Sequence, residues 1–402
     1  MSRGIRRVAV TGLGAIAALG LDAPSIWQAI QLATCGIRPI TSLPTDRLTV
    51  RTAAEVIGFD PSAHFDEHRL AMLDRTSQLA LAAAREALRD SAETPPARGG
   101  VVLGAAVGQL TLDAAYRTLY GDNVRRLPPL TVPRGMPSAP ASHISIEFGL
   151  RGASFAVASA CASSSHAIGL AFQMIRAGTL DMAVTGGSDA SLCLGYLKAW
   201  ESLRVLSPDT CRPFSKDRDG LVIGEGAGIL LLEDWERATA RGAAVQAEII
   251  GFGMSADAVD MTAPDAAGAA QAMQAALDDA GVSAEAVDYV NAHGTGTRLN
   301  DRTEVAALRL VFGGGMKRLP VSSSKSMFGH CLNAGGALEA VVTAMALRDG
   351  VLPPTIGFRE ADPDCAIDCV PNVARLAPIE VAMSNSFAFG GLNAALLMRR
   401  AA

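Results

Sequence analysis

Short apolar runs alternate along the chain with longer segments in which apolar residues recur at helical spacing. The short runs predict buried β-strands, and the longer segments predict amphipathic helices. Residues 74–90, rich in alanine and leucine with polar residues along one side, give the strongest helix signal. Residues 121–140 contain several prolines and predict a loop. The predicted strands are residues 7–11, 101–107, 154–159, 182–186, 227–232, 247–252, 289–292, 319–322, 381–384 and 394–399, and the predicted helices are residues 25–31, 74–90, 111–120, 163–177, 266–280, 301–311 and 335–348.

The predicted elements fall into two halves that echo each other. Arg-Val-Ala-Val-Thr-Gly-Leu-Gly opens the first half, and Ala-Glu-Ile-Ile-Gly-Phe-Gly opens the second. Each half then places a reactive residue at the end of a buried strand, Cys161 in the first and His293 in the second. This layout predicts an α/β fold of two duplicated units, residues 1–240 and 241–402, with the active site between them.

The composition argues against several classes of protein. With 402 residues, 49% of them hydrophobic, the chain can bury a large core. A formal net charge of −5 gives no support to nucleic-acid binding, which needs a strong basic field. The seven cysteines are scattered without a Cys-x-x-Cys pair, which argues against a disulfide framework or a zinc site. No apolar run reaches the roughly 18–20 residues that span a membrane. We therefore expect a protein of the reducing cytoplasm, without membrane insertion.

Cys161 is the residue that most narrows the chemistry. It stands where an apolar run stops and a helix of small residues begins. Unpaired N–H groups and the partial positive charge of a helix N-terminus stabilise a thiolate, so we expect the pKa of this thiol to fall below its usual value of about 8.5. Two histidines follow in glycine-rich segments, His293 and His330. Together these groups indicate acyl transfer, although the thiol alone also fits a hydrolase, a thiolase or a redox site.

Six segments, in order along the chain, resemble the motifs of the β-ketoacyl-[acyl-carrier-protein] synthases of the elongating types I and II. They are Ala-Cys-Ala-Ser-Ser-Ser-His-Ala-Ile-Gly, Arg-Pro-Phe-Ser-Lys-Asp-Arg-Asp-Gly, Gly-Glu-Gly-Ala-Gly, Asn-Ala-His-Gly-Thr-Gly-Thr, Lys-Ser-Met-Phe-Gly-His and Asn-Ser-Phe-Ala-Phe-Gly-Gly-Leu-Asn-Ala. The resemblance implies the thiolase-like five-layer αβαβα fold. The short loop at residues 206–212 looks like that of the specialised synthases that build nodulation-signal or aryl-polyene chains.

The resemblance assigns roles to the central residues. Cys161 would hold the acyl chain, while His293 and His330 would assist the decarboxylation of malonyl carrier. The backbone N–H groups of Cys161 and Phe389, the gating residue, would form the oxyanion hole. Lys325 is expected to pair with Glu304 and to tune the two histidines.

Further residues are implied by the same resemblance. Asp301 is expected to support the site beside Glu304. Thr295 and Thr297 would bind the pantetheine arm, and Val107 would limit acyl length at a dimer interface. No cofactor is required, but a structural Na⁺ or K⁺ is expected at Asn291, Glu339, Ser384 and Asn385. The chain departs from the usual motifs at two positions: Ala388 stands where the family usually has glycine, and Gly296 stands where it usually has serine.

The implied activity is decarboxylative condensation of the acyl group with malonyl-acyl carrier protein, which gives 3-oxoacyl-acyl carrier protein. We expect a homodimer that docks the carrier protein through basic residues. The alternative is the catalytic ketosynthase subunit of a heterodimeric polyketide or aryl-polyene system; a thiolase, a cysteine hydrolase and a non-catalytic chain-length partner fit the motifs less well. The docking candidates are Arg69, Arg125, Arg126 and Arg204.

Overall fold

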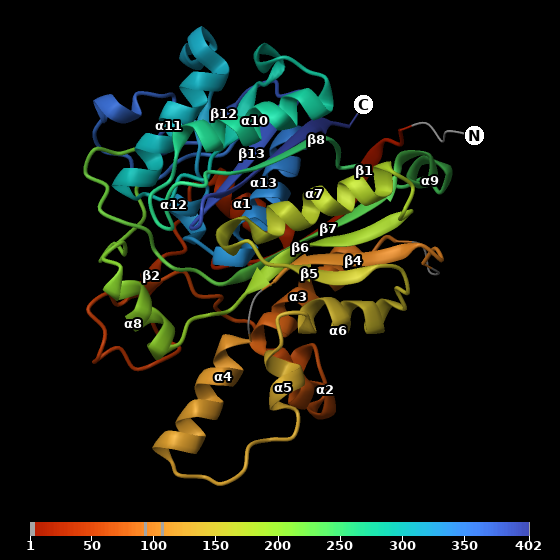
Figure 1. The fold of residues 1–402 in the computed structure, drawn as a ribbon, viewed down its shortest axis with the longest axis vertical. Helices are drawn as coiled ribbons and strands as arrows, with labels where there is room; N and C mark the ends of the chain where they lie inside the picture. Colours follow the sequence, from red (N-terminus) through yellow and green to blue (C-terminus); the bar gives the residue numbers. More distant parts are fainter. Residues whose placement is uncertain (1–4, 92–94, 106–107, 402) are drawn as a thin grey trace.

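Two sets of five strands with the same spatial order form the centre of the computed structural model, which describes residues 5–91, 95–105 and 108–401 (Figure 1). The first set runs β5-β4-β6-β7-β1 and the second runs β10-β9-β13-β14-β8. In both, the fourth strand runs antiparallel to its two neighbours. The repeated order and direction fit a duplicated unit, while the boundary after residue 240 stays a prediction. The strands are β1 Val8–Ile16, β4 Gly99–Gly104, β5 Ser154–Val157, β6 Met182–Asp189, β7 Gly226–Asp234, β8 Ala247–Ala256, β9 Tyr289–Asn291, β10 Val321–Ser322, β13 Val381–Ala388 and β14 Leu392–Arg400, with short pairs β2 Arg38–Pro39 with β3 Thr52–Ala53 and β11 Val351–Leu352 with β12 Arg375–Leu376.

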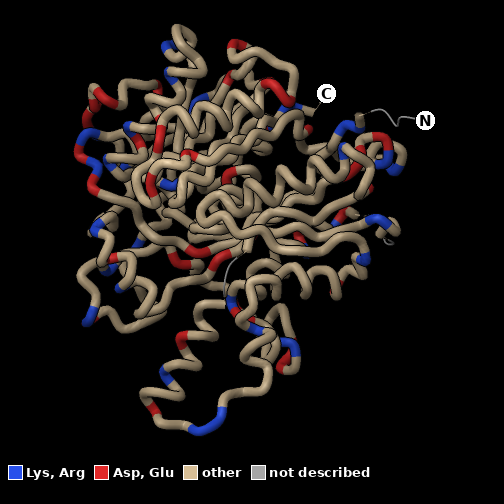
Figure 2. Tube along the Cα trace, viewed as in Figure 1, with Lys and Arg blue, Asp and Glu red and all other residues tan. Residues whose placement is uncertain are grey.

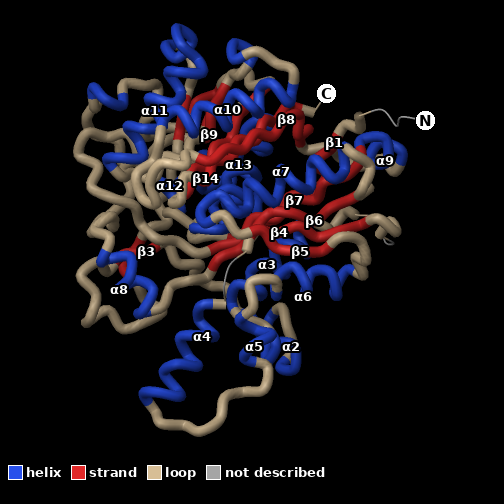
Figure 3. Tube along the Cα trace, viewed as in Figure 1, coloured by secondary structure: helices blue, strands red, loops and turns tan. Residues whose placement is uncertain are grey.

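Helices complete five layers. The two sets of strands join where Val8 of β1 pairs with Ile249 of β8. Figure 3 shows α7 and α13 between the two sets, with α3 outside the first and α10 outside the second. This arrangement confirms the expected thiolase-like fold. The helices are α1 Ala23–Gln31, α2 Glu67–Met72, α3 Arg75–Ala87, α4 Gln109–Tyr116, α5 Thr131–Gly135, α6 Ala139–Phe148, α7 Ser163–Arg176, α8 Leu194–Ser202, α9 Trp235–Ala240, α10 Ala266–Ala280, α11 Arg298–Phe312, α12 Lys325–Phe328 and α13 Gly335–Asp349.

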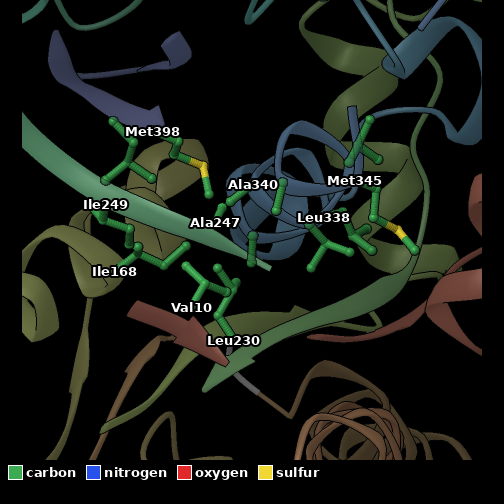
Figure 4. Close-up of a cluster of buried hydrophobic side chains, with 14 of the residues drawn as sticks. Val10, Ile168, Leu230, Ala247, Ile249, Leu338, Ala340, Met345 and Met398 are labelled. Atoms are coloured by element: carbon green, nitrogen blue, oxygen red, sulfur yellow. The ribbon is translucent and has the colours of Figure 1, made fainter. Parts of the chain in front are cut away.

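The core is continuous across the two halves. Val10 and Leu230 of the first half pack with Ile249 of the second and with Leu338 of α13 (Figure 4). Helix α13 is buried on every side from Gly335 to Leu347 because it lies between both sets of strands. This helix therefore fixes how the halves, and the reactive residues that each carries, are placed relative to one another.

The predicted loop at residues 121–140 is partly wrong. It contains α5 and the start of α6, whose first turn carries Pro140, a residue that favours the first turn of a helix. Figure 1 shows that α4, α5 and the segment between them project from the body of the molecule. Figure 2 shows basic residues at the far end of this projection, in the segment that contains Arg125 and Arg126.

Candidate active site

Cys161 lies in a tight turn between β5 and α7. The turn is the 3₁₀ segment Ala160–Ala162, and Ala160 has a φ of +47°, which a residue with a side chain rarely adopts. The Ser163 hydroxyl stabilises the turn, since its Oγ accepts the N–H of Ser159 at 2.9 Å and lies 2.6 Å from the carbonyl oxygen of Ala160. The nucleophile is thus presented by a strained backbone that nearby hydrogen bonds hold.

The expectation of a low thiol pKa for Cys161 is wrong. Burial raises the pKa of this thiol to about 11, although the nearby Lys325 ammonium acts in the opposite direction. The free energy needed to remove a thiolate from water is larger here than the stabilisation that the helix terminus and the lysine provide. Cys161 is therefore a neutral thiol at rest.

His293 and His330 meet next to this thiol in one cleft. Their ring centroids lie 5.4 Å apart with the planes at 86°. Burial and the Lys325 charge hold the pKa of both rings well below the ordinary value, so both are neutral. Nδ1 of His330 accepts the N–H of Leu332 at 3.3 Å, and the ring proton of neutral His330 must therefore lie on Nε2.

The two acidic residues beside the histidines stabilise the loop after β9. Glu304 accepts the N–H of His293 at 2.8 Å and that of Gly294 at 2.7 Å. The expected pair between Glu304 and Lys325 is therefore wrong: the Lys325 ammonium pairs with Glu339 of α13. Burial raises the pKa of Glu304 to about 7.

Asp301 supports the same loop from its other end. It accepts the N–H of Phe214 at 2.9 Å and that of Gly296 at 3.2 Å, and it lies 3.5 Å from the Arg218 guanidinium. Gly296 has a φ of +77°, and an added Cβ would come within 2.9 Å of the Gly220 carbonyl oxygen. Glycine is favoured at position 296 because of this positive φ and this close carbonyl, which explains why the chain departs from the usual motif there.

The cleft leads from Cys161 to the surface and has about 710 Å³ of empty space, counting the part that is open to solvent. Thr295 and Thr297 line it and share a hydrogen bond of 2.9 Å between their hydroxyls. Phe389 also lines it and stacks on Trp200, with ring centroids 6.0 Å apart. Sequence reasoning missed Trp200 and its helix α8, although Leu197 and Trp200 have the spacing of a buried helix face.

Three of the four residues expected at a cation site share one face of the second set of strands. Asn291 and Ser384 are register partners on β9 and β13, and Glu339 belongs to α13, which packs on β13. The side chain of Asn385 points to the other face, where it lies 3.3 Å from the sulfur of Met273 on α10. The side chain of Asn385 is therefore not placed to join the other three.

The remaining predicted residues are distributed around the molecule. Val107 lies outside the described residues. Arg69 is paired with Glu147 at 2.7 Å, whereas Arg125, Arg126 and Arg204 are exposed. No helix among the described residues is long and apolar enough to cross a membrane.

Two family models match the chain. They are "Beta-ketoacyl synthase, N-terminal domain", over residues 5–238, and "Beta-ketoacyl synthase, C-terminal domain", over residues 246–359. The chain belongs to the beta-ketoacyl synthase family. This ketosynthase is accordingly an acyltransferase.

Individual relatives match over almost the full length of the ketosynthase. Nodulation protein E of Rhizobium sp. (strain N33) is 48% identical over 400 residues, which cover 98% of this chain and 99% of the relative. The 3-oxoacyl-[acyl-carrier-protein] synthase 2 of Staphylococcus aureus (strain COL) is 40% identical over 407 residues and 98% of each chain. A β-ketoacyl synthase structure from Burkholderia phymatum STM815 superposes with a TM-score of 0.92 at 36% identity, covering 99% of this chain and 100% of the other.

Proposed function

We propose that the protein condenses an acyl group held on Cys161 with malonyl-acyl carrier protein to give 3-oxoacyl-acyl carrier protein. The observation that carries the proposal is the single cleft shared by Cys161, His293 and His330, with the His330 ring proton on Nε2. A neutral imidazole in that state can donate to an enolate oxygen without being a cation.

The proposed reaction has two stages. The sulfur of Cys161 attacks the acyl thioester, the carbon–sulfur bond to the carrier breaks, and the thiol proton passes to the leaving thiolate. Malonyl carrier then loses carbon dioxide, and the electron pair of the broken bond forms an enolate. The enolate carbon bonds to the acyl carbonyl carbon, and the sulfur of Cys161 leaves and takes a proton from solvent.

The surrounding residues fit these steps. His293 and His330 would hold the enolate oxygen, and burial together with the Lys325 charge would keep both rings neutral. The N–H groups of Cys161 and Phe389 would hold the oxygen of the acyl thioester. Thr295 and Thr297, on the wall of the cleft, would bind the pantetheine arm, whereas Val107 would limit acyl length.

Acyl loading tests the proposal directly. Cys161→Ser should abolish the acyl adduct that mass spectrometry detects on the wild type, and Cys35→Ser, at an exposed thiol, is the matched control. Cys161→Gln should still decarboxylate malonyl carrier without condensation. An undiminished adduct on Cys161→Ser would overturn the assignment of the nucleophile. Acyl carriers of graded length would then give the chain-length preference.

We also propose a structural Na⁺ or K⁺ between β9, β13 and α13. Oδ1 of Asn291, Oε2 of Glu339 and Oγ of Ser384 are buried atoms without a hydrogen-bond partner among the described residues. An oxygen-only donor set suits a hard cation, and such buried atoms are costly without one.

A homodimer is the proposed assembly, and the strand β5 supports it. This strand ends the first set of strands and exposes Phe155, while Ile146 of the neighbouring α6 is 73% exposed. An open strand edge with apolar neighbours favours pairing with another chain. The mass of the purified protein in solution tests this assembly.

A heterodimer is the second candidate. Similar structures include "The ishigamide ketosynthase/chain length factor", with a TM-score of 0.95 and 36% identity over 99% of this chain, and the ketosynthase ApeO in complex with its chain length factor ApeC. Activity of the purified chain alone would favour the homodimer.

The carrier protein would dock near the exposed Arg125, Arg126 and Arg204. The cytoplasm is the proposed location, because free cysteines are typical of proteins in a reducing compartment.

A further inference from the structure

Asn333 lies between the nucleophile turn and a buried carboxylate that the condensation does not use. Its amide Nδ2 donates to Oδ2 of Asp189 at 2.8 Å, and its Oδ1 lies 3.1 Å from Oγ of Ser163. The two contacts agree with one orientation of the amide, because a carboxylate accepts only from the NH₂ side and the hydroxyl can donate to the oxygen.

Burial and hydrogen bonds hold the carboxylate of Asp189 in a fixed position. The residue ends β6, it is 1% exposed, and it also accepts the hydroxyl of Ser191. Burial raises its pKa to about 6 although Ser191 and Asn333 lower it, so the carboxylate is ionised at neutral pH. The turn that carries Asn333, Leu332–Ala334, packs closely on this strand, since a Cβ at Gly187 would lie 3.0 Å from the carbonyl oxygen of Asn333.

Ser163 links Asn333 and the Asp189 carboxylate to the strained nucleophile turn. Its hydroxyl oxygen lies 2.6 Å from the carbonyl oxygen of Ala160, the residue with positive φ that precedes Cys161, and 3.1 Å from Oδ1 of Asn333. We infer that Asn333 is a positioning residue, which holds the turn of Cys161 against Asp189 through Ser163. The inference rests on the proposed function, because it concerns acyl loading onto Cys161.

The contacts of His330 come from backbone groups, not from the Asn333 side chain: its ring accepts the N–H of Leu332 at 3.3 Å, a donor that Asn333→Ala leaves in the chain. The backbone N–H of His330 donates to the carbonyl of Val222 at 2.7 Å, and its carbonyl accepts the N–H of Gly224 at 2.9 Å. The loss of the Asn333 side chain should therefore disturb the nucleophile and leave the imidazole in place. Loading and decarboxylation should respond differently.

The first experiment uses Asn333→Ala. The rate of acyl transfer from carrier to Cys161 should fall about 10- to 100-fold, as expected for a displaced nucleophile. Malonyl decarboxylation, measured in the Cys161→Gln background with and without Asn333→Ala, should change less than about twofold. Equal losses in both assays, or unchanged loading, would overturn the inference. Loading of the wild type in the same assay shows separately whether the proposed function holds.

A rescue experiment excludes a general loss of folding. Asn333→Asp faces two carboxylates toward each other and should slow loading. The double variant Asp189→Asn with Asn333→Asp reverses donor and acceptor and should recover most of the loading rate. In a double-mutant cycle, Ser163→Ala with Asn333→Ala should be no slower than the slower single variant. Failure of the reversed pair to recover in a protein of normal melting temperature, or additive losses in the cycle, would contradict the positioning role.

Discussion

The ammonium group of Lys325 lies against the carboxylate of Glu339, and neither side chain is more than 1% exposed. The pair joins α12, next to His330, to the central helix α13. Burial lowers the pKa of His293 and of His330, and the positive end of this pair lowers both further. Lys325 thus acts on the histidines through its charge, held in place by a carboxylate from another layer.

Glu339→Gln should destabilise the protein strongly. The change preserves the shape of the side chain but leaves the Lys325 charge buried without a partner, which costs about 3–5 kcal/mol. Denaturant unfolding above pH 7 measures the loss, because burial raises the pKa of Glu339 to about 7 and the carboxylate is ionised above that value. Glu380→Gln is the control: this residue is 68% exposed and pairs with Arg400 at the surface. Equal stability of the two variants would contradict a buried charged pair.

Alkylation of Cys161 should increase with pH well beyond neutrality. The pKa of about 11 reflects burial first, then the opposing charges of Lys325, which lowers it, and of Asp189 and Glu339, which raise it. Only the thiolate reacts, so the rate with iodoacetamide should rise about tenfold per pH unit below that value. Peptide mapping distinguishes Cys161 from the exposed Cys35. A plateau reached near neutral pH would instead show a resting thiolate.

The sequence pattern predicted all ten strands of the two five-stranded sets, and α10 to the residue. Apart from the edge strand β5, these elements are buried on one or both faces, so their hydrophobic spacing follows directly from packing. Several helices were missed, among them α6, which packs on α3, β4 and β5, and α8, which packs against the segments before and after it. Both lie at the edge of the fold, where local spacing is a weak guide.

The motifs brought Cys161, His293 and His330 into one site, but they did not give the electrostatics. A list of motifs cannot say which carboxylate reaches Lys325; the position of α13 decides in favour of Glu339. Nor does a helix start reveal how deeply a thiol is buried, and burial dominates the pKa of Cys161. Both corrections depend on how the elements pack in three dimensions, which the motifs do not contain.

Glu304→Gln should impair decarboxylation without affecting acyl loading. The amide keeps one acceptor but turns an NH₂ group toward one of the two backbone N–H donors of His293 and Gly294. An unsatisfied buried donor costs about 1–3 kcal/mol, which is roughly a tenfold loss if His293 shifts. The matched control is Glu285→Gln on the surface of the same half. Carbon dioxide release in the Cys161→Gln background measures the effect, and an equal loss of loading would show general unfolding instead.

The proposed cation should make the stability of the protein depend on the salt. Binding to the folded state alone stabilises by about 2.7 kcal/mol when the ion is at 100 times its Kd. Melting in Na⁺ or K⁺ should therefore occur at a higher temperature than in tetramethylammonium, an ion too large for the site, at equal ionic strength. Ser384→Ala removes one donor on the shared face and should reduce this difference, whereas Ser142→Ala on the distant α6 should keep it. A melting temperature that is the same in all three salts would show that Asn291, Glu339 and Ser384 hold no ion.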